Sequence, residues 1–407
     1  MAKPEIRLQG FEGEWKNKKI GELSDILTGY PFEGSSIKKN GKYLLMRGIN
    51  ITEGYIRHSD DIDRYYDGDI NLLTKYILDT NDLVIGMDGS KVGKNSALVT
   101  DFEKGSLLVQ RVARLRNSST NVIRLIQIAL RSSKFIQYVE ENKTSSAIPH
   151  ISPSDIYNFE ISISDNANEQ KWVADYFKSL DSMIQATTKK IASLKQMKQA
   201  CLVSMFPQAG ETTPRVRFKG FKGEWERKSF GDLYYQNVVK NDLSFGTDKI
   251  ISVANMFFKT NSYISDQNYL RTYNIFRLGD IAFEGNKSKN FAHGRFVENT
   301  IGDGIVSHVF DVFSPKSDKH DLNYWKYAIN NERIMGRILV RCTKASTMMT
   351  NLVAKDFLKE YILVPSYEEQ IKIGSFFSSL DSQISLQEAR LEKLKHIKSA
   401  CLDKMFV

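Results

Sequence analysis

A long stretch of this chain occurs twice. Residues 169–206 read EQKWVADYFKSLDSMIQATTKKIASLKQMKQACLVSMF, and residues 369–406 read EQIKIGSFFSSLDSQISLQEARLEKLKHIKSACLDKMF, without a gap between the aligned copies. In each copy mainly apolar residues recur every 3.5 residues over roughly four heptads, the a/d seam of a coiled coil. The first seam comprises Val173, Phe177, Leu180, Ile184, Thr187, Ile191, Leu194, Lys198, Cys201 and Met205, and the second Ile373, Phe377, Leu380, Ile384, Gln387, Leu391, Leu394, Lys398, Cys401 and Met405. Each helix should be roughly 55 Å long, and each seam has a partner in the other.

The repeat begins well before these helices. Residues 7–23 (RLQGFEGEWKNKKIGEL) return at 217–233 as RFKGFKGEWERKSFGDL, with the Gly-Phe-x-Gly-Glu-Trp lead-in matched. We interpret Trp15 and Trp225 as buried anchors of this lead-in rather than as residues that stack on a ligand. A polar linker at 207–216 (PQAGETTPRV) separates the copies. Because this linker is short, the second unit must start near the end of the first helix, which predicts antiparallel helices.

The middle of each unit differs in sequence but keeps its order of elements. Short apolar runs separated by Gly, Asn and Asp indicate strands and turns. The first unit has such runs at 43–46, 83–85 and 107–115 and a helical pattern around 122–141; the second has them at 249–256, 281–283 and 305–313, with a helical pattern around 321–340. The Asn-Asp-Leu at 81–83 corresponds to the Gly-Asp-Ile at 279–281, and a loop containing Gly and Lys follows each (86–95 and 284–294). One scaffold therefore carries two different surfaces.

Composition limits the function classes. A length of 407 residues with 41% hydrophobic content predicts two or three folded domains, and a formal charge of +9 favours a polyanionic partner. The three cysteines, Cys201, Cys342 and Cys401, lack metal-ligand spacing. The polar first residues are not those expected of a signal peptide, and no apolar run is long enough to span a membrane. We expect a cytoplasmic protein without a membrane association.

Catalytic motifs are missing from the sequence. The loop at 86–95 lacks the spacing of a P-loop, since Asp88 and Asn95 occupy the positions that a P-loop fills with Gly and Ser or Thr. No two prolines are adjacent, which excludes an Asn-Pro-Pro-aromatic methyltransferase motif, and the six histidines show no zinc spacing. We predict no catalytic residues, no metal and no cofactor.

The duplicated order of these features resembles the specificity subunit of type I restriction-modification systems. The resemblance rests on the lead-in, the variable region with its Gly-Asp-Ile strand, the Ser- and Thr-rich stretches at 143–151 and 343–350, and the Glu-Gln that opens each long helix. It covers essentially the whole chain. It implies a non-catalytic subunit in an α+β fold: two pseudo-symmetric mixed α/β target recognition domains separated by an antiparallel pair of long coiled-coil helices. The implied domains are 1–165, the helix 166–206, the linker 207–216, 217–365 and the helix 366–407.

The resemblance also implies binding partners and a way of recognising a DNA sequence. Double-stranded DNA would be read as a bipartite, gapped site, one half by each recognition domain, while the helices set the spacing and dock two methyltransferase subunits, with restriction subunits outside. The helix lysines, including Lys189, Lys190, Lys195, Lys393 and Lys395, are either part of such a docking face or a solvated surface.

The candidate DNA-binding residues are polar or cationic side chains in the loops. They are Arg47, Ser90, Lys91, Lys94, Asn95, Arg111, Lys143, Thr144, Ser145 and His150 in the first unit, and Asn286, Lys287, Lys289, Asn290, His308, Lys344, Ser346 and Thr347 in the second. The loop lysines could equally be ordinary surface residues, and the two histidines hydrogen-bonded structural residues. Sequence alone does not separate phosphate contacts from base contacts.

Two other classes remain open at this level. One is an enzyme with an unrecognised active site, which would cut or methylate DNA by itself. The other is a coiled-coil scaffold that binds only proteins, which would show no sequence-selective affinity for DNA.

Overall fold

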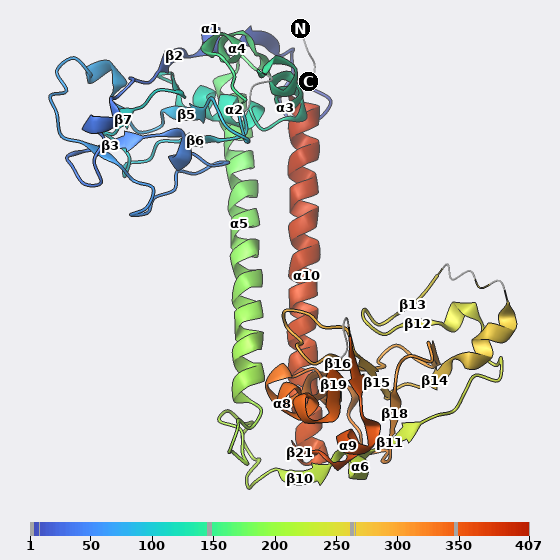
Figure 1. Ribbon diagram of the computed structural model, residues 1–407. Coiled ribbons are helices and arrows are strands. Elements are labelled where there is room, and N and C mark those ends of the chain that lie inside the picture. Colours follow the sequence, from blue (N-terminus) through green and yellow to red (C-terminus); the bar gives the residue numbers. More distant parts are fainter. Residues whose placement is uncertain are drawn as a thin grey trace. The chain divides into compact units, whose positions relative to one another are not determined.

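The structure, a computed structural model, describes residues 4–7, 9–144, 149–260, 264, 266–345 and 349–406. The chain divides into two compact units. Unit 1 comprises Met1–Thr188 and Ala389–Val407, and unit 2 comprises Lys189–Glu388. Each unit thus contains one mixed α/β region and a part of both long helices (Figure 1).

The elements of the first half of the chain are short strands and helices that lead into one long helix. They are β1 (Lys16–Lys19), α1 (Ile20–Leu23), β2 (Asp25–Thr28), η1 (Gly34–Ser36), β3 (Tyr43–Met46), η2 (Gly48–Asn50), β4 (Tyr65–Tyr66), η3 (Thr74–Tyr76), β5 (Leu83–Gly86), β6 (Ser96–Leu98), β7 (Leu107–Leu108), β8 (Val112–Arg116), α2 (Thr120–Ala129), α3 (Ser133–Asn142), α4 (Pro153–Asn158), β9 (Glu160–Ile163) and α5 (Ala167–Ser204).

The second half repeats this plan. Its elements are β10 (Glu226–Ser229), α6 (Phe230–Leu233), β11 (Tyr234–Asn237), η4 (Thr247–Lys249), β12 (Ile251–Ser252), β13 (Phe257–Phe258), η5 (Gln267–Thr272), β14 (Asn274–Phe276), β15 (Ile281–Glu284), β16 (Arg295–Glu298), β17 (Gly304–Val306), β18 (Val312–Pro315), α7 (Leu322–Ile329), α8 (Glu332–Cys342), β19 (Thr343–Ala345), β20 (Thr350–Leu352), α9 (Ala354–Lys359), β21 (Tyr361–Val364) and α10 (Tyr367–Met405).

A four-stranded antiparallel sheet forms the centre of each unit. The strand order is β2-β8-β5-β6 in unit 1 and β11-β18-β15-β16 in unit 2, the same arrangement of corresponding strands. Side chains alternate between the two faces of a strand. In β5, Leu83 and Ile85 face α2, α3 and the long helices, whereas Val84 packs with Met46 from the β3 layer. Both faces are therefore buried, which is why β5 and β15 appear in the sequence as continuous apolar runs.

The Asp-containing turn before each central strand is a backbone requirement. Asn81 has a φ of 71° and Gly279 a φ of 88°, in the left-handed region that Asn and Gly tolerate best. The Asp that follows accepts a hydrogen bond from the main chain three residues earlier: Asp82 from the Asp79 N–H at 2.7 Å and Asp280 from the Arg277 N–H at 2.8 Å. The matched Asn-Asp-Leu and Gly-Asp-Ile motifs are thus structural.

The lead-in is attached to the start of each long helix by a buried arginine–glutamate pair. Strand β1 pairs with β9, and β10 pairs with β21. Arg7 donates two hydrogen bonds of 2.7 Å to Glu169, and Arg217 donates two of 2.7 Å to Glu369. Trp15 also donates to Glu169 at 3.2 Å. Both lead-in tryptophans are buried, as the sequence predicted.

The long helices run antiparallel to each other within each unit. In unit 1, Tyr176 meets Cys401 and Asp181 meets Lys398. In unit 2, Lys195 pairs with Glu388 at 2.6 Å and Lys198 with Asp381 at 2.5 Å. In both cases the residue number rises along α5 as it falls along α10. Most of the predicted seam residues are buried, including Thr187 at a polar heptad position.

Several predicted elements are divided in the structure. The prediction of a single helix around 122–141 and another around 321–340 is wrong. Each range forms two helices, α2 with α3 and α7 with α8. The side chains of Ser132 and Asn331 accept hydrogen bonds from the main-chain N–H groups of Phe135 and Arg333, so each caps a new helix. The apolar runs at 107–115 and 305–313 likewise form two strands each, and the run at 249–256 contributes only β12.

In the part of the chain that the structure describes, no helix combines the length and the apolar character needed to cross a bilayer.

Candidate nucleic-acid interface

The loop between β5 and β6 carries four of the predicted residues: Ser90, Lys91, Lys94 and Asn95. Backbone hydrogen bonds hold this loop against the segment that leads to α4. The Gly89 N–H donates to the Pro149 carbonyl at 3.0 Å, and the Ile151 N–H donates to the Met87 carbonyl at 3.0 Å. Gly93 has a φ of 76°, and a Cβ there would lie 2.6 Å from Val139 of α3. The loop therefore lies flush on α3.

Arg111 and His150 are brought to the same loop. The Met87 N–H donates to the Arg111 carbonyl at 3.0 Å, and the Arg111 guanidinium donates to Asp88 at 3.2 Å. Arg111 has a φ of 64°, an unusual conformation for a non-glycine residue, and its side chain remains 65% exposed. His150 forms a β-bridge with Asp88, and its Nδ1 lies 2.9 Å from the Thr144 hydroxyl. His150 is thus hydrogen-bonded as well as exposed.

The remaining predicted residues of unit 1 are not part of the loop between β5 and β6. Arg47 follows β3, next to the turn that carries Arg111, because the Val109 N–H donates to the Met46 carbonyl at 3.1 Å. Lys143 ends α3 and pairs with Glu140 at 2.5 Å. Ser145 lies outside the described residues.

Unit 2 holds its corresponding loop in the same way. The loop between β15 and β16 carries Asn286, Lys287, Lys289 and Asn290. Asn286 forms a β-bridge with Met349, and the Thr350 N–H donates to the Gly285 carbonyl at 2.8 Å.

The other predicted residues of unit 2 are less closely tied to this loop. Lys344 lies on β19, paired with Asn351 of β20. His308 lies in the turn between β17 and β18, and among the described residues no backbone hydrogen bond connects it with the loop. Ser346 and Thr347 fall outside the described residues.

Arg295 at the base of the second loop was missed by the sequence analysis. Its Nε donates to Glu284 at 2.7 Å, its Nη2 donates to the Ala254 carbonyl at 2.8 Å, and its guanidinium carbon lies 5.2 Å from the centroid of the Phe291 ring. Ala254 is distant in sequence, so no local pattern indicates this contact.

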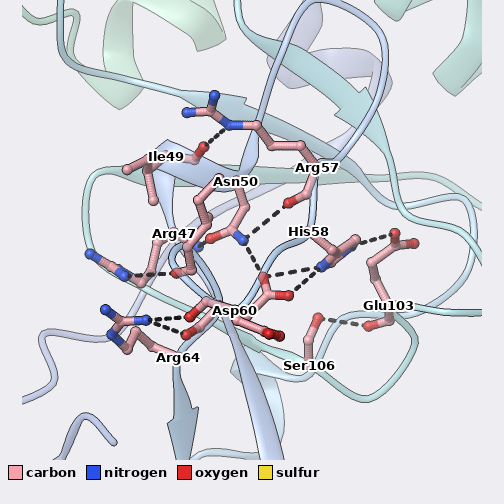
Figure 2. Close-up of polar contacts among 11 residues, drawn as sticks. Arg47, Ile49, Asn50, Arg57, His58, Asp60, Arg64, Glu103 and Ser106 are labelled. Carbon is pink, nitrogen blue, oxygen red and sulfur yellow. Dashed lines mark hydrogen bonds and ion pairs between the residues drawn. The ribbon is translucent and has the colours of Figure 1, made fainter. Parts of the chain in front are cut away.

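A polar network around Asn50 in unit 1 was also missed (Figure 2). Asn50, which is 1% exposed, donates to Asp63 at 2.8 Å. His58 contacts Asp63 through Nδ1 at 3.2 Å and Glu103 through Nε2 at 3.0 Å. Burial raises the pKa of Glu103, but hydrogen bonds from Thr100 and His58 outweigh burial and lower it. The network fixes the backbone between β3 and β4.

This network supports three arginines. Arg57 donates to the Ile49 carbonyl at 2.7 Å, Arg47 to the Ile62 carbonyl at 3.3 Å and Arg64 to the Asp63 carbonyl at 2.6 Å (Figure 2). Within the described ranges these guanidinium groups make no ion pair with a carboxylate. Each therefore keeps donors and charge for an anion, and phosphate is an anion that arginine binds well.

No group of three or more His, Cys, Asp or Glu side chains among the described residues is arranged to hold a metal ion. The positions described above offer cations and amides on a rigid support. Such a surface is suited to binding rather than to bond-breaking chemistry.

A model of the type I restriction modification DNA specificity domain matches residues 12–196 and again residues 223–396. This chain belongs to that family. The two matches coincide with the two copies of the repeat, which confirms the family and the fold class predicted from the sequence. Membership of this family agrees with the prediction of a non-catalytic specificity subunit.

One curated relative is the specificity subunit of the EcoAI type I restriction enzyme from Escherichia coli, with 27% identity over 191 residues. The matched segment covers 46% of this chain and 31% of that relative, so the chain matches about a third of the relative's length.

Solved structures share the fold. The type I restriction-modification S subunit from M. genitalium aligns with a TM-score of 0.59 at 16% identity, covering 100% of this chain and 99% of that chain. A second chain, from a structure of complex assembly and conformational transition in the type I R-M system, aligns with a TM-score of 0.51 at 13% identity over 97% of this chain and 98% of that chain.

Proposed function

We propose that this chain is the DNA-specificity subunit of a type I restriction-modification complex. It reads a bipartite, gapped site in double-stranded DNA and contains no catalytic centre of its own. The recognition domains span 1–165 and 217–365, and the helices 166–206 and 366–407 with the linker 207–216 connect them. The complex acts in the cytoplasm.

One observation carries the proposal: the same sheet order occurs twice, between lead-ins and long helices that match in pattern, yet the loops on the two sheets differ. Each loop carries two lysines, but in unit 1 the loop at 87–95 lies on α3, and the Asn50 network holds a group of arginines. In unit 2 the loop at 285–294 is built on Arg295 and Phe291. A protein that holds two unlike cationic surfaces on one repeated scaffold can read two unlike half-sites.

The helix pair supplies the spacing and the assembly surface. Helix length sets the gap between half-sites, as dimer geometry does in other DNA-reading proteins. Two methyltransferase subunits dock on the outer helix faces, where Lys189, Lys190 and Lys393 are exposed. Restriction subunits join outside them.

The test is a methylome comparison. Genomic DNA from cells with and without this gene is sequenced for modified bases. Loss of methylation at one gapped motif on deletion, and its return on complementation, supports the proposal. An unchanged methylome in cells that express the partner subunits contradicts it.

A further inference from the structure

A cleft in unit 2 extends the candidate surface toward the long helices. Its volume is about 770 Å³, and it lies between the loop at 285–294, the junction of α7 and α8, and helix α5. Four cationic side chains line it, against two carboxylates. The cations are Lys198, Arg295, Lys326 and Arg333, and the carboxylates are Glu332 and Asp381.

The charges in this cleft are not all balanced from within the protein. Asp381 is occupied by Lys198 at 2.5 Å and by the Tyr327 hydroxyl at 2.6 Å. Burial raises the pKa of Asp381, but hydrogen bonds from Lys198 and Tyr327 outweigh burial and lower it, so the carboxylate is ionised. Lys326 and Arg333 are exposed and form no ion pair within the described part of the chain. These two cations face one further carboxylate, Glu332, whose pKa is raised by burial, so the cleft keeps a positive charge that no ion pair with Asp381 neutralises.

Unit 1 has a corresponding cleft of about 500 Å³. It is lined by Lys94 from the candidate loop, by Arg131 at the junction of α2 and α3, and by Lys395 and Lys398 from α10, against the carboxylates of Glu53 and Asp181. Asp181 is occupied in the same manner, by Lys398 at 2.5 Å and Arg131 at 2.9 Å. The same count of four cations and two carboxylates therefore occurs in both units, although Lys395 also pairs with Glu392 at 2.8 Å.

We propose that each cleft holds a stretch of DNA phosphate backbone that flanks the half-site read by the neighbouring loop. In unit 2 the phosphates are bound by Lys326 and Arg333, on the recognition domain beside the long helices. This inference rests on the proposed function and adds a sequence-independent subsite to it. Continuity favours DNA over an acidic protein segment, because the cleft wall includes Asn290 and Phe291 of the candidate loop itself.

The experiment uses the full chain co-purified with its methyltransferase subunits. The double variant K326Q/R333Q removes two charges and keeps side chains of similar length. Each lost phosphate contact lowers the slope of log affinity against log salt by about 0.9, so the slope should fall by about two. The loss should be the same on target and non-target duplexes, and the preferred sequence should not change. The charge-retaining variant K326R/R333K should keep the original slope.

A matched control leaves the cleft itself unchanged. K355Q/K359Q removes two exposed charges from α9, in the same unit but outside the cleft lining, and should leave the slope unchanged. An unchanged slope for K326Q/R333Q overturns the inference, as does weaker binding of the methyltransferase subunits with a normal salt slope. A wild-type complex that shows no sequence preference would instead contradict the proposed function.

Discussion

Equivalent residues in the two units have different environments. Asp82 forms two hydrogen bonds with Arg116, at 2.6 and 2.5 Å. The strand register places Ser314 of β18 at the position of Arg116, and Asp280 is hydrogen-bonded to this uncharged side chain instead of to a guanidinium. Burial raises the pKa of Asp280 to about 6. The repeated motif therefore keeps its turn but not its charge balance.

The raised pKa gives a pH prediction. The folded protein keeps a proton on Asp280 until about pH 6, whereas the unfolded chain releases it near the ordinary value of about 4. Between these values the folded state binds more protons, so the free energy of unfolding of unit 2 falls as pH rises, by up to about 3 kcal/mol. D280N should lack this fall and be the more stable protein at pH 7. Denaturant unfolding between pH 4 and pH 7 measures this free energy, with D318N, a substitution of an exposed aspartate, as the control. Parallel curves of unfolding free energy against pH for D280N and wild type would contradict the prediction.

The lead-in pair predicts a large effect from one residue. Glu369 is 1% exposed, and Arg217 also donates to the Gly223 carbonyl at 2.6 Å. R217A leaves a buried carboxylate without its partner, which should cost about 3 kcal/mol of unfolding free energy. R215A, two residues away, removes an exposed pair with Glu211 and should cost less than about 1 kcal/mol. Equal losses in the two variants, measured by urea unfolding, would show that the lead-in is not held by this pair.

At the scale of elements, the internal repeat predicted the two long helices correctly. Local apolar patterns predicted the limits of the shorter helices and strands less well. The long helices follow from a heptad pattern sustained over many turns, which has few alternatives. The breaks between α2 and α3 and between α7 and α8 were missed because apolar residues continue across them. The sequence signals for these breaks were the capping residues Ser132 and Asn331. Each has a residue of the same type beside it in the sequence, so the capping position is not obvious. The two-strand runs were missed for a related reason, since Arg111 adopts a positive φ that its residue type does not indicate.

The helix pair predicts a change in spacing alone. Inserting seven residues after Thr187 and seven after Gln387 adds one heptad to each helix and preserves the seams. Each helix becomes longer by about 10 Å, so the gap between half-sites should widen by about three base pairs, since DNA rises about 3.4 Å per pair. A methylation map should report unaltered half-sites. Changed half-site bases with an unchanged gap would show that the helices do not set the spacing.

At the scale of the whole molecule, the sequence predicted the duplicated α+β organisation because repeats are visible without knowledge of tertiary contacts. The recognition surfaces were only partly predicted. In unit 1, Arg111 and His150 are main-chain partners of the loop at 87–95, and in unit 2 the loop at 285–294 pairs with Met349 and Thr350. The Asn50 network and Arg295 join residues that are far apart in sequence, and only the fold reveals them.

We propose that each variable region reads its own half of the target. The most direct measurement replaces residues 24–165 with the corresponding region of another type I specificity subunit and maps methylated bases in cells that carry the chimera. The lead-in and helices that hold this region stay in place, so we expect a motif in which one half-site is new while the other half-site is retained. A motif in which both halves change together, or in which the replaced half survives, would contradict it.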